Sequence, residues 1–201
     1  MQKKILPKVW HFIWDDDSIW SWIVNIILAF VLIKFIIYPI LGLIFGTSFP
    51  IVAVVSGSME HDGPFNVWWD LQKDWYEKYN ITKEDFLNYP LKNGFDCGDM
   101  IILFGIEPDK IDKGTIIVFF DKTGRPIIHR VVKIKDKNGI MFQTKGDHNF
   151  DSGEIDMNIG QENIVGRASF SIPFLGYVKI GGVELFEAMG IIDEQATCLN
   201  V

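Results

Sequence analysis

A serine follows a short apolar run near residue 50, as a nucleophile at the end of a strand would. Residues Ile51 to Ser56 are mostly β-branched and apolar, which favours a buried strand, and the run stops at Gly57, just before Ser58. A serine hydroxyl is a weak nucleophile at neutral pH, so it needs a general base within hydrogen-bond reach and donors for an oxyanion. Ser58 is therefore a candidate nucleophile for a hydrolytic reaction.

The candidate base is His129, one of four histidines. It interrupts the apolar segment Pro126–Val132, where an imidazole is either satisfied in the core or chemically active. The other three are less suited because they precede the longest apolar run, follow Ser58 too closely or lie among acids: His11, His61 and His148.

Two aspartates, Asp147 and Asp151, lie in the turn after the strand that should pair with that of His129. A carboxylate there can accept the second imidazole N–H, fix its tautomer and stabilise the imidazolium. A turn carboxylate that follows a glycine commonly binds its own loop's N–H groups, so we expect a structural role for Asp147 and expect Asp151 to orient His129. Asp156 is a more remote candidate. Alternating oxygens in this turn also match a calcium loop, but its final glutamate is missing.

The apolar run from Ile19 to Phe45 predicts an element that holds these residues beside a lipid bilayer. Its only strongly polar residues are Asn25 and Lys34, and it exceeds the ~20 residues that a spanning helix needs. A central lysine costs about 2.5 to 3.5 kcal/mol, which the apolar neighbours offset. The run is also longer than the roughly 7 to 15 residues of a signal-peptide core, so we expect an uncleaved anchor over residues 19–46.

Charge around the anchor predicts its orientation. Three lysines precede the run, and no lysine or arginine follows it before Lys73. The positive-inside rule then predicts a cytoplasmic N-terminus over residues 1–18 and an extracytoplasmic domain over residues 47–201, at the cell membrane.

Residues 61–96 form an aromatic-rich segment with helical periodicity. We expect two short helices, Val67 to Tyr79 and Lys83 to Asn88, the second opened by a capping box between Thr82 and Asp85. The aromatic side chains either pack on the domain or enter the membrane interface. We expect the second for three tryptophans close to the anchor in sequence: Trp68, Trp69 and Trp75.

The remainder is dominated by short segments rich in Ile, Val and Phe, separated by turn-forming residues. They are Met100–Phe104, Thr115–Phe120, Ile127–Ile134, Ile140–Thr144, Ile164–Ile172 and Gly176–Ile180. Consecutive short strands without intervening helices predict a mainly β, antiparallel domain. A last short helix is expected over Val183–Met189.

Composition excludes some function classes. The net charge is −7 without a basic cluster, so we expect no nucleic-acid partner. Cys97 and Cys198 lack metal-binding spacing, and the sequence leaves open whether they pair.

Seven ordered blocks resemble type I signal peptidases, most closely the archaeal and endoplasmic-reticulum branch. They are Ser56–Glu60, Gly98–Ile102, Lys113–Phe119, Ile128–Val132, Lys145–Asn149, Val165–Ala168 and Ile172–Gly176. Bacterial relatives have a lysine base in the block that holds His129 here. The chain departs from the family at His61, where proline is usual, and in the inserted segment; Asp151 aligns with the family's aspartate only across a gap.

The resemblance implies a Ser-His-Asp mechanism on an anchored β domain. Ser58 would be the nucleophile, His129 the base, and Asp151 or Asp147 the orienting acid. The Ser58 N–H and the Ser56 hydroxyl would hold the oxyanion, and Met59 would help line shallow substrate pockets.

Secretory preproteins with small-residue cleavage sites would be the substrates, without metal or organic cofactor, while any accessory membrane subunits stay undetermined. The alternatives are a site-specific or self-cleaving serine protease of the same fold and a membrane-anchored β module that binds a partner without catalysis.

Overall fold

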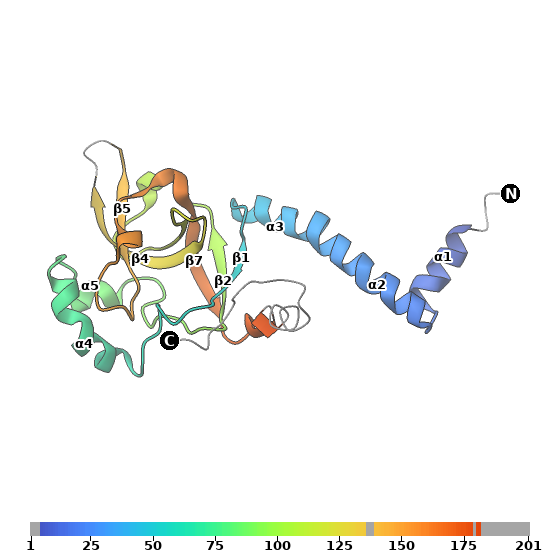
Figure 1. Cartoon of the computed structure of the whole chain (residues 1–201), viewed down its shortest axis with the longest axis horizontal. Coiled ribbons are helices and arrows are strands. Elements are labelled where there is room, and N and C mark those ends of the chain that lie inside the picture. The colour runs from blue at the N-terminus through green and yellow to red at the C-terminus, as the bar shows by residue number, and fades with distance from the viewer. Residues whose placement is uncertain (1–4, 136–138, 179, 182–201) are drawn as a thin grey trace. The chain divides into compact units, whose positions relative to one another are not determined.

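The computed structural model describes residues 5–135, 139–178, 180 and 181, and the chain divides between Ile44 and Phe45 into two compact units. In the first unit α1 spans Ile5–Trp14 (Figure 1). After it, α2 (Ile19–Leu32), the π-helical turn η1 (Ile33–Ile37) and α3 (Tyr38–Phe45) follow one another without a break. Together they make a 27-residue candidate membrane span whose most apolar window has a mean hydropathy of 2.6 and no buried residue.

A proline explains the π-helical turn within the span. Pro39 has no N–H for the carbonyl of Phe35, and its ring crowds that carbonyl. The Tyr38 N–H instead donates to the Ile33 carbonyl, five residues back, which is the π-helical pattern. Lys34 lies in this turn.

Two polar side chains of α2 bind the end of α1. The last carbonyls of a helix have no intrahelical donor. The Ser21 hydroxyl donates to the Phe12 carbonyl at 2.6 Å, and Asn25 Nδ2 donates to the Ile13 carbonyl at 2.9 Å. Asn25, one of the two polar residues in the apolar run, therefore connects two helices.

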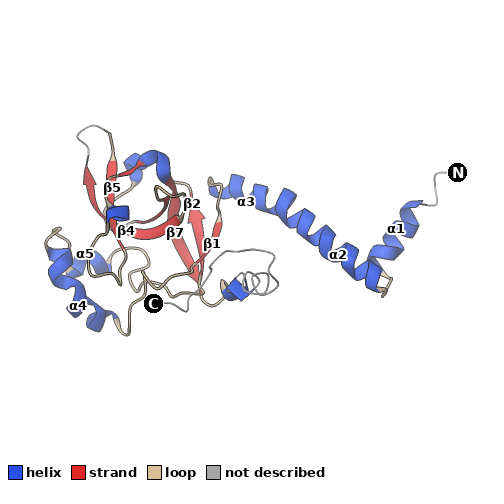
Figure 2. Cartoon of the chain, in the orientation of Figure 1, coloured by secondary structure: helices blue, strands red, loops and turns tan. Residues whose placement is uncertain are grey.

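The second unit is built on a seven-stranded antiparallel sheet in the order β1-β2-β7-β3-β4-β5-β6 (Figures 1 and 2). The strands are β1 (Ile51–Ala53), β2 (Met100–Phe104), β3 (Ile116–Phe120), β4 (Pro126–Lys135), β5 (Met141–Lys145), β6 (Ile159–Gly160) and β7 (Ile164–Ile172). Three 3₁₀ turns lie between them: η2 (Pro108–Lys110), η3 (Glu154–Asp156) and η4 (Gln161–Asn163). The mainly β prediction is confirmed.

The strand predicted over Gly176–Ile180 is wrong. Tyr177 and Val178 are helical, and the Ile180 N–H donates to the Gly176 carbonyl at 3.1 Å. Phe174 has a positive φ of 62°, and the Gly176 N–H binds the Gly98 carbonyl, so the chain turns away from the sheet. The helix expected over Val183–Met189 lies outside the described residues.

The inserted segment forms α4 (Phe65–Glu77) and α5 (Lys83–Leu87), and the predicted capping box between Thr82 and Asp85 is present. Trp68 and Trp69 are each only 3% exposed and pack in one cluster with aromatic and aliphatic neighbours: Tyr76, Ile81, Phe86 and Val132. Trp75 packs against the same cluster. The expectation that these tryptophans enter the membrane interface is therefore wrong for Trp68 and Trp69, whose rings are buried in the domain, while for the half-buried Trp75 it stays a prediction.

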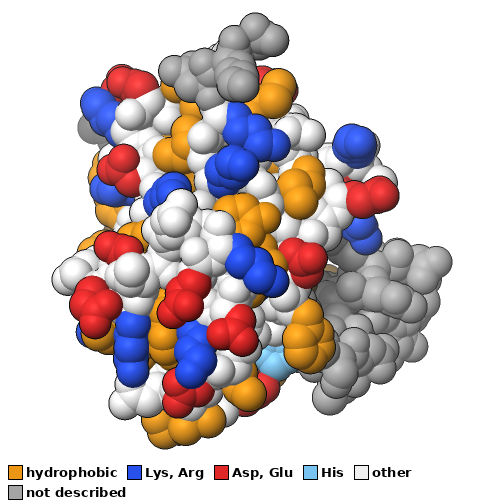
Figure 3. Space-filling model, turned by 90° about the vertical axis from the view of Figure 1, so that its left-hand side faces the viewer, with side chains coloured by type: hydrophobic (Ala, Val, Ile, Leu, Met, Phe, Trp, Pro, Cys, Tyr) orange, Lys and Arg blue, Asp and Glu red, His pale blue; other side chains and the backbone are white. Residues whose placement is uncertain are grey.

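The surface on this side has mixed charge. Figure 3 shows Lys and Arg side chains interspersed with Asp and Glu on the side that carries α4 and α5 in Figure 1, with hydrophobic side chains scattered between them. Such a surface is typical of a solvated face.

Cys97 is disulfide-bonded, and Cys198 lies outside the described residues.

Candidate active site

Strand β4 presents two polar side chains on consecutive residues, His129 and Arg130. Successive residues of a strand point to opposite faces, so the two meet different partners. His129 is 4% exposed, and its Nδ1 lies 2.6 Å from Asp156 Oδ1. A carboxylate accepts this N–H, so the lone pair is left on Nε2, as a general base requires.

Asp156 is fixed by its own surroundings. It ends η3 and is 1% exposed. Its Oδ1 also accepts the Thr144 hydroxyl at 2.5 Å, and its Oδ2 accepts the Gly153 N–H at 3.0 Å. These contacts come from β5 and from the turn that follows it, and they hold the carboxylate against the imidazole of His129.

Asp151 does not reach His129, which corrects the contact expected from sequence. It is exposed, and its Oδ1 accepts Trp75 Nε1 at 2.7 Å and the Ser152 N–H at 2.7 Å. The Trp75 hydrogen bond lowers the pKa of Asp151. Residues 150 and 151 lie at the surface, and it is η3 that brings a carboxylate, that of Asp156, to His129.

Ser58 lies in a turn closed by the Glu60 N–H on the Gly57 carbonyl at 3.0 Å. Its Oγ is 3.3 Å from Ser56 Oγ, and its carbonyl accepts the His148 N–H at 3.0 Å. Among the described residues the Ser58 hydroxyl bonds Ser56 and not His129.

Gly146 lies between Ser58 and His129. A Cβ atom on Gly146 would be 2.6 Å from the Ser58 carbonyl oxygen and 2.9 Å from His129 Nε2. Contacts this short are not tolerated, so only glycine fits where both residues approach the loop backbone. The structure thus brings Ser58 and His129 to one point of the 145–149 loop.

Met59 is placed differently from the expectation. Its side chain is fully buried in a core cluster, and its sulfur accepts the Asp147 N–H at 3.4 Å. A side chain without exposed surface cannot line a pocket open to substrate. Met59 instead joins the turn over residues 57–60, which holds the candidate nucleophile Ser58 (the nucleophile turn), to the 145–149 loop.

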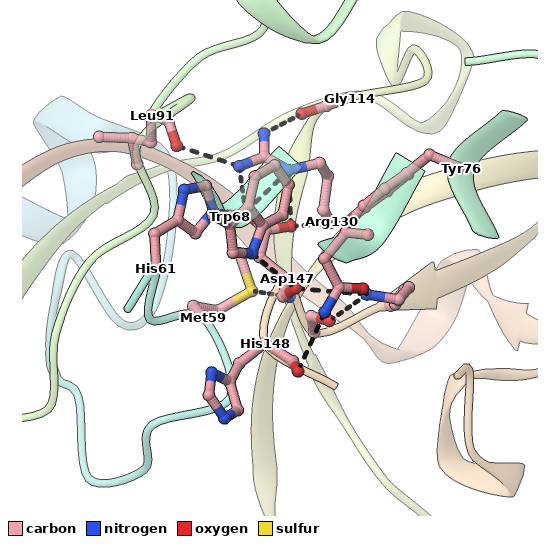
Figure 4. A network of polar contacts seen from close by, with 12 residues as sticks. Met59, His61, Trp68, Tyr76, Leu91, Gly114, Arg130, Asp147 and His148 are labelled. Atoms are coloured by element: carbon pink, nitrogen blue, oxygen red, sulfur yellow. Dashed lines mark hydrogen bonds and ion pairs between the residues drawn. The ribbon is translucent and has the colours of Figure 1, made fainter. Parts of the chain in front are cut away.

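Asp147 belongs to a separate buried network around Arg130 (Figure 4). Arg130 binds its carboxylate through Nε at 2.9 Å and Nη2 at 2.6 Å. The other guanidinium N–H groups bind carbonyls of Pro90, Leu91 and Gly114, so all its donors have partners. Burial alone would raise the pKa of Asp147, but the Arg130 charge and the His61 hydrogen bond hold it well below its usual range.

His61, where the family usually has proline, is part of this network. Its Nε2 lies 3.1 Å from Asp147 Oδ2, and its ring stacks on Trp68 with centroids 3.7 Å apart. An ionised carboxylate only accepts hydrogen bonds, so Nε2 carries the proton. Nδ1 is the one buried side-chain nitrogen or oxygen without a partner among the described residues. His61 therefore faces Asp147 rather than Ser58.

Relatives of known function match this chain. The curated proteins named "Signal peptidase complex catalytic subunit SEC11C" from Homo sapiens, Canis lupus familiaris and Mus musculus are each 32% identical over 148 residues, covering 67% of this chain. The chain belongs to the type I signal peptidase family. The chain spans 58% of the length of those curated proteins. No protein-family model matches it.

Two residues of the site, Asp156 and Gly146, give only weak signals in the sequence of this signal peptidase. Asp156 stands three residues after Gly153, a spacing at which a carboxylate can bind the N–H that opens a helical turn, but its contact with His129 arises only in the folded chain. Gly146 carries no side-chain signal, and its role follows from its neighbours. Within the described residues, no group of three or more His, Cys, Asp or Glu side chains is arranged to hold a metal.

Proposed function

We propose that this chain is a membrane-anchored serine endopeptidase that removes signal peptides from secretory preproteins. One observation carries the proposal: a buried His129–Asp156 pair has its Nε2 edge against the same glycine that the Ser58 carbonyl contacts. The relatives' name, which specifies a catalytic subunit, supports the same reaction class.

In this proposal Ser58 Oγ attacks the scissile carbonyl while His129 Nε2 takes its proton. The tetrahedral intermediate collapses, the proton passes from His129 to the leaving amine, and an acyl-enzyme ester remains on Ser58. Water then attacks the ester with His129 again acting as base. Asp156 replaces Asp151 as the residue that orients the imidazole. Catalytic hydrogen bonds are often unformed without substrate, so the Ser58 hydroxyl turns from Ser56 to His129 when the peptide binds.

The oxyanion is held by the Ser58 N–H and the Ser56 hydroxyl. Ser56 Oγ, 3.3 Å from the nucleophile oxygen, is close enough to donate to a developing negative charge beside it. We expect Ser56→Ala to lower kcat by roughly 10²-fold, the typical loss for one such donor.

An extended cleavage segment would add to the sheet beside β1. β1 stands at the end of the strand order among the described residues, and extended peptides commonly add beside the end strand of a sheet through main-chain hydrogen bonds. The residues that follow, Val55 and Ser56, are exposed and lead directly to Ser58. A segment with small side chains would approach this edge most closely.

The catalytic unit would lie outside the cytoplasm. Lysines before the span and none directly after it favour this orientation. The disulfide at Cys97 adds support, because disulfides persist in oxidising compartments. Protease added to intact cells should therefore digest residues beyond Gly46, and protection there would contradict the orientation.

The deciding experiment uses the full chain in detergent with a model preprotein. We expect cleavage after a small residue, and no cleavage by Ser58→Ala or His129→Ala at unchanged melting temperature. Turnover by Ser58→Ala would reject the proposal in favour of a binding module. Cleavage of the chain itself, without preprotein cleavage, would favour a self-cleaving protease. Activity of the purified chain also tests whether accessory subunits are required.

A further inference from the structure

The 145–149 loop bridges the nucleophile turn and the inserted helix α4. Its N–H groups face the nucleophile turn: the His148 N–H donates to the Ser58 carbonyl at 3.0 Å, and the Asp147 N–H donates to Met59 Sδ at 3.4 Å. A shift of this loop would therefore move Ser58.

The carbonyl groups of the same loop face α4. Trp68 Nε1 donates to the Asp147 carbonyl at 3.1 Å, and Gln72 Nε2 donates to the His148 carbonyl at 3.4 Å. The loop thus has donors bound to the nucleophile turn and acceptors bound to the insertion, so its position depends on both.

Lys145 strengthens the attachment to α4. Its Nζ is fully buried and binds the Gly146 and Asp147 carbonyls at 3.0 and 3.3 Å. The third bond, at 3.0 Å, goes to Gln72 Oε1 of α4. Two aromatic rings of α4, Trp75 and Tyr76, lie 5.2 and 4.8 Å from the ammonium. Such rings stabilise a cation removed from water.

Tyr76, which also belongs to α4, fixes the side chain of Asp147. Its hydroxyl donates to Asp147 Oδ1 at 3.0 Å, and both residues are fully buried. Arg130 and His61 bind the remaining positions of the carboxylate, as Figure 4 shows. The Asp147 residue is thereby held through its side chain, its carbonyl and its N–H.

We propose that α4 is a positioning element for catalysis, in which Tyr76 and Trp68 set the place of Ser58 and the Gly146 backbone through Asp147. The inference rests on the proposed function. It assigns to the insertion a role inside the domain: without α4, the Ser58–His129 approach over Gly146 would relax, and a displacement of about 1 Å at reacting groups is enough to cost roughly 10²-fold in rate.

The test uses conservative variants, because deleting the insertion would expose the aromatic cluster and unfold the domain. Tyr76→Phe removes only the hydroxyl on Asp147, and Trp68→Phe keeps a ring under His61 but removes the N–H on the Asp147 carbonyl. Tyr89→Phe is the matched control, since Tyr89 packs on the same cluster and its hydroxyl makes no hydrogen bond to another described residue. We expect Tyr76→Phe and Trp68→Phe each to lower kcat roughly tenfold with KM unchanged, measured well below each melting temperature.

Two results would overturn the inference. If melting temperatures fall while kcat stays at the wild-type value, α4 is only a structural cover. If KM rises at constant kcat, the insertion contributes to substrate binding instead. Both are read against wild-type cleavage and an inactive Ser58→Ala, so they leave the proposed function standing; its own failure would appear as turnover by Ser58→Ala.

Discussion

His129 and Arg130 are neighbours in β4, and each meets a buried aspartate, yet the two pairs have opposite chemical properties. Arg130 is permanently charged, and every donor it has is occupied, as is the Asp147 carboxylate. Among the described residues His129 is bound through Nδ1 alone, to Asp156, so its Nε2 keeps a lone pair that can accept a proton. A buried carboxylate is therefore suited to a structural or to a catalytic role according to the basic side chain beside it, and according to whether that side chain has a nitrogen left to accept a proton.

Asp156→Asn is the strictest test of the difference between the His129–Asp156 pair and the Arg130–Asp147 pair. An amide fills the same space but donates to Nδ1, which favours the wrong imidazole tautomer. We expect kcat to fall by roughly 10³- to 10⁴-fold with a nearly unchanged melting temperature. Cleavage assays and thermal melts on the purified chain measure both. Near-normal activity of this variant would remove the distinction between the two pairs.

Asp147→Asn should mainly destabilise the protein. Neutralising this residue leaves Arg130 buried without its counter-charge, a change that costs about 3 to 5 kcal/mol. Because the folded pKa of Asp147 is depressed, its contribution is present above the unfolded value near pH 3.9 and is lost as pH falls. Urea unfolding of wild type should show this acid loss, and the variant should lack it.

Asp70→Asn is the control for that change. Asp70 pairs with Lys73 at the surface, where such pairs contribute little, so its replacement should barely move the unfolding midpoint. A loss of kcat in Asp147→Asn as deep as that of Asp156→Asn, at full stability, would instead place Asp147 in the reaction.

Lys145, the second buried cation near Asp147, provides a pH test. Burial lowers its pKa to about 8, below the roughly 10.4 of an unfolded lysine. Between these values the unfolded chain binds more protons, so the free energy of unfolding should rise with pH by about 1 kcal/mol per unit. Lys145→Met should lack the rise. A wild-type curve parallel to that of the variant across this window would show that the lysine is hydrated.

The smallest effect is expected for Asp151→Asn. The residue is exposed, and an amide oxygen can still accept the Trp75 N–H. Activity should match wild type, with at most a slight decrease in melting temperature. A clear loss of kcat would return Asp151 to the catalytic group and weaken the assignment of Asp156.

Local patterns determined the elements of this protein. The apolar run predicts one long helix, alternating Ile, Val and Phe segments predict the strands, and Thr82 with Asp85 predicts the cap of α5. These features depend on residues near one another in the chain, so the spacing of residue types in the sequence is enough to predict them. The position of His129 within a strand was predictable for the same reason. The strand expected up to Ser56 is shorter in the structure: β1 ends at Ala53, and Ser58 lies in the turn that follows.

Tertiary structure alone decided which partners these residues have. Helical spacing of aromatic residues in α4 predicts an apolar face but does not say what it covers, and here that face lies on the domain rather than in a membrane. The choice among three aspartates depends on how η3 returns to β4 beside β5, where Thr144 and His129 meet one carboxylate. Such contacts join residues many positions apart, and their free energy arises only when burial removes water from both partners at once.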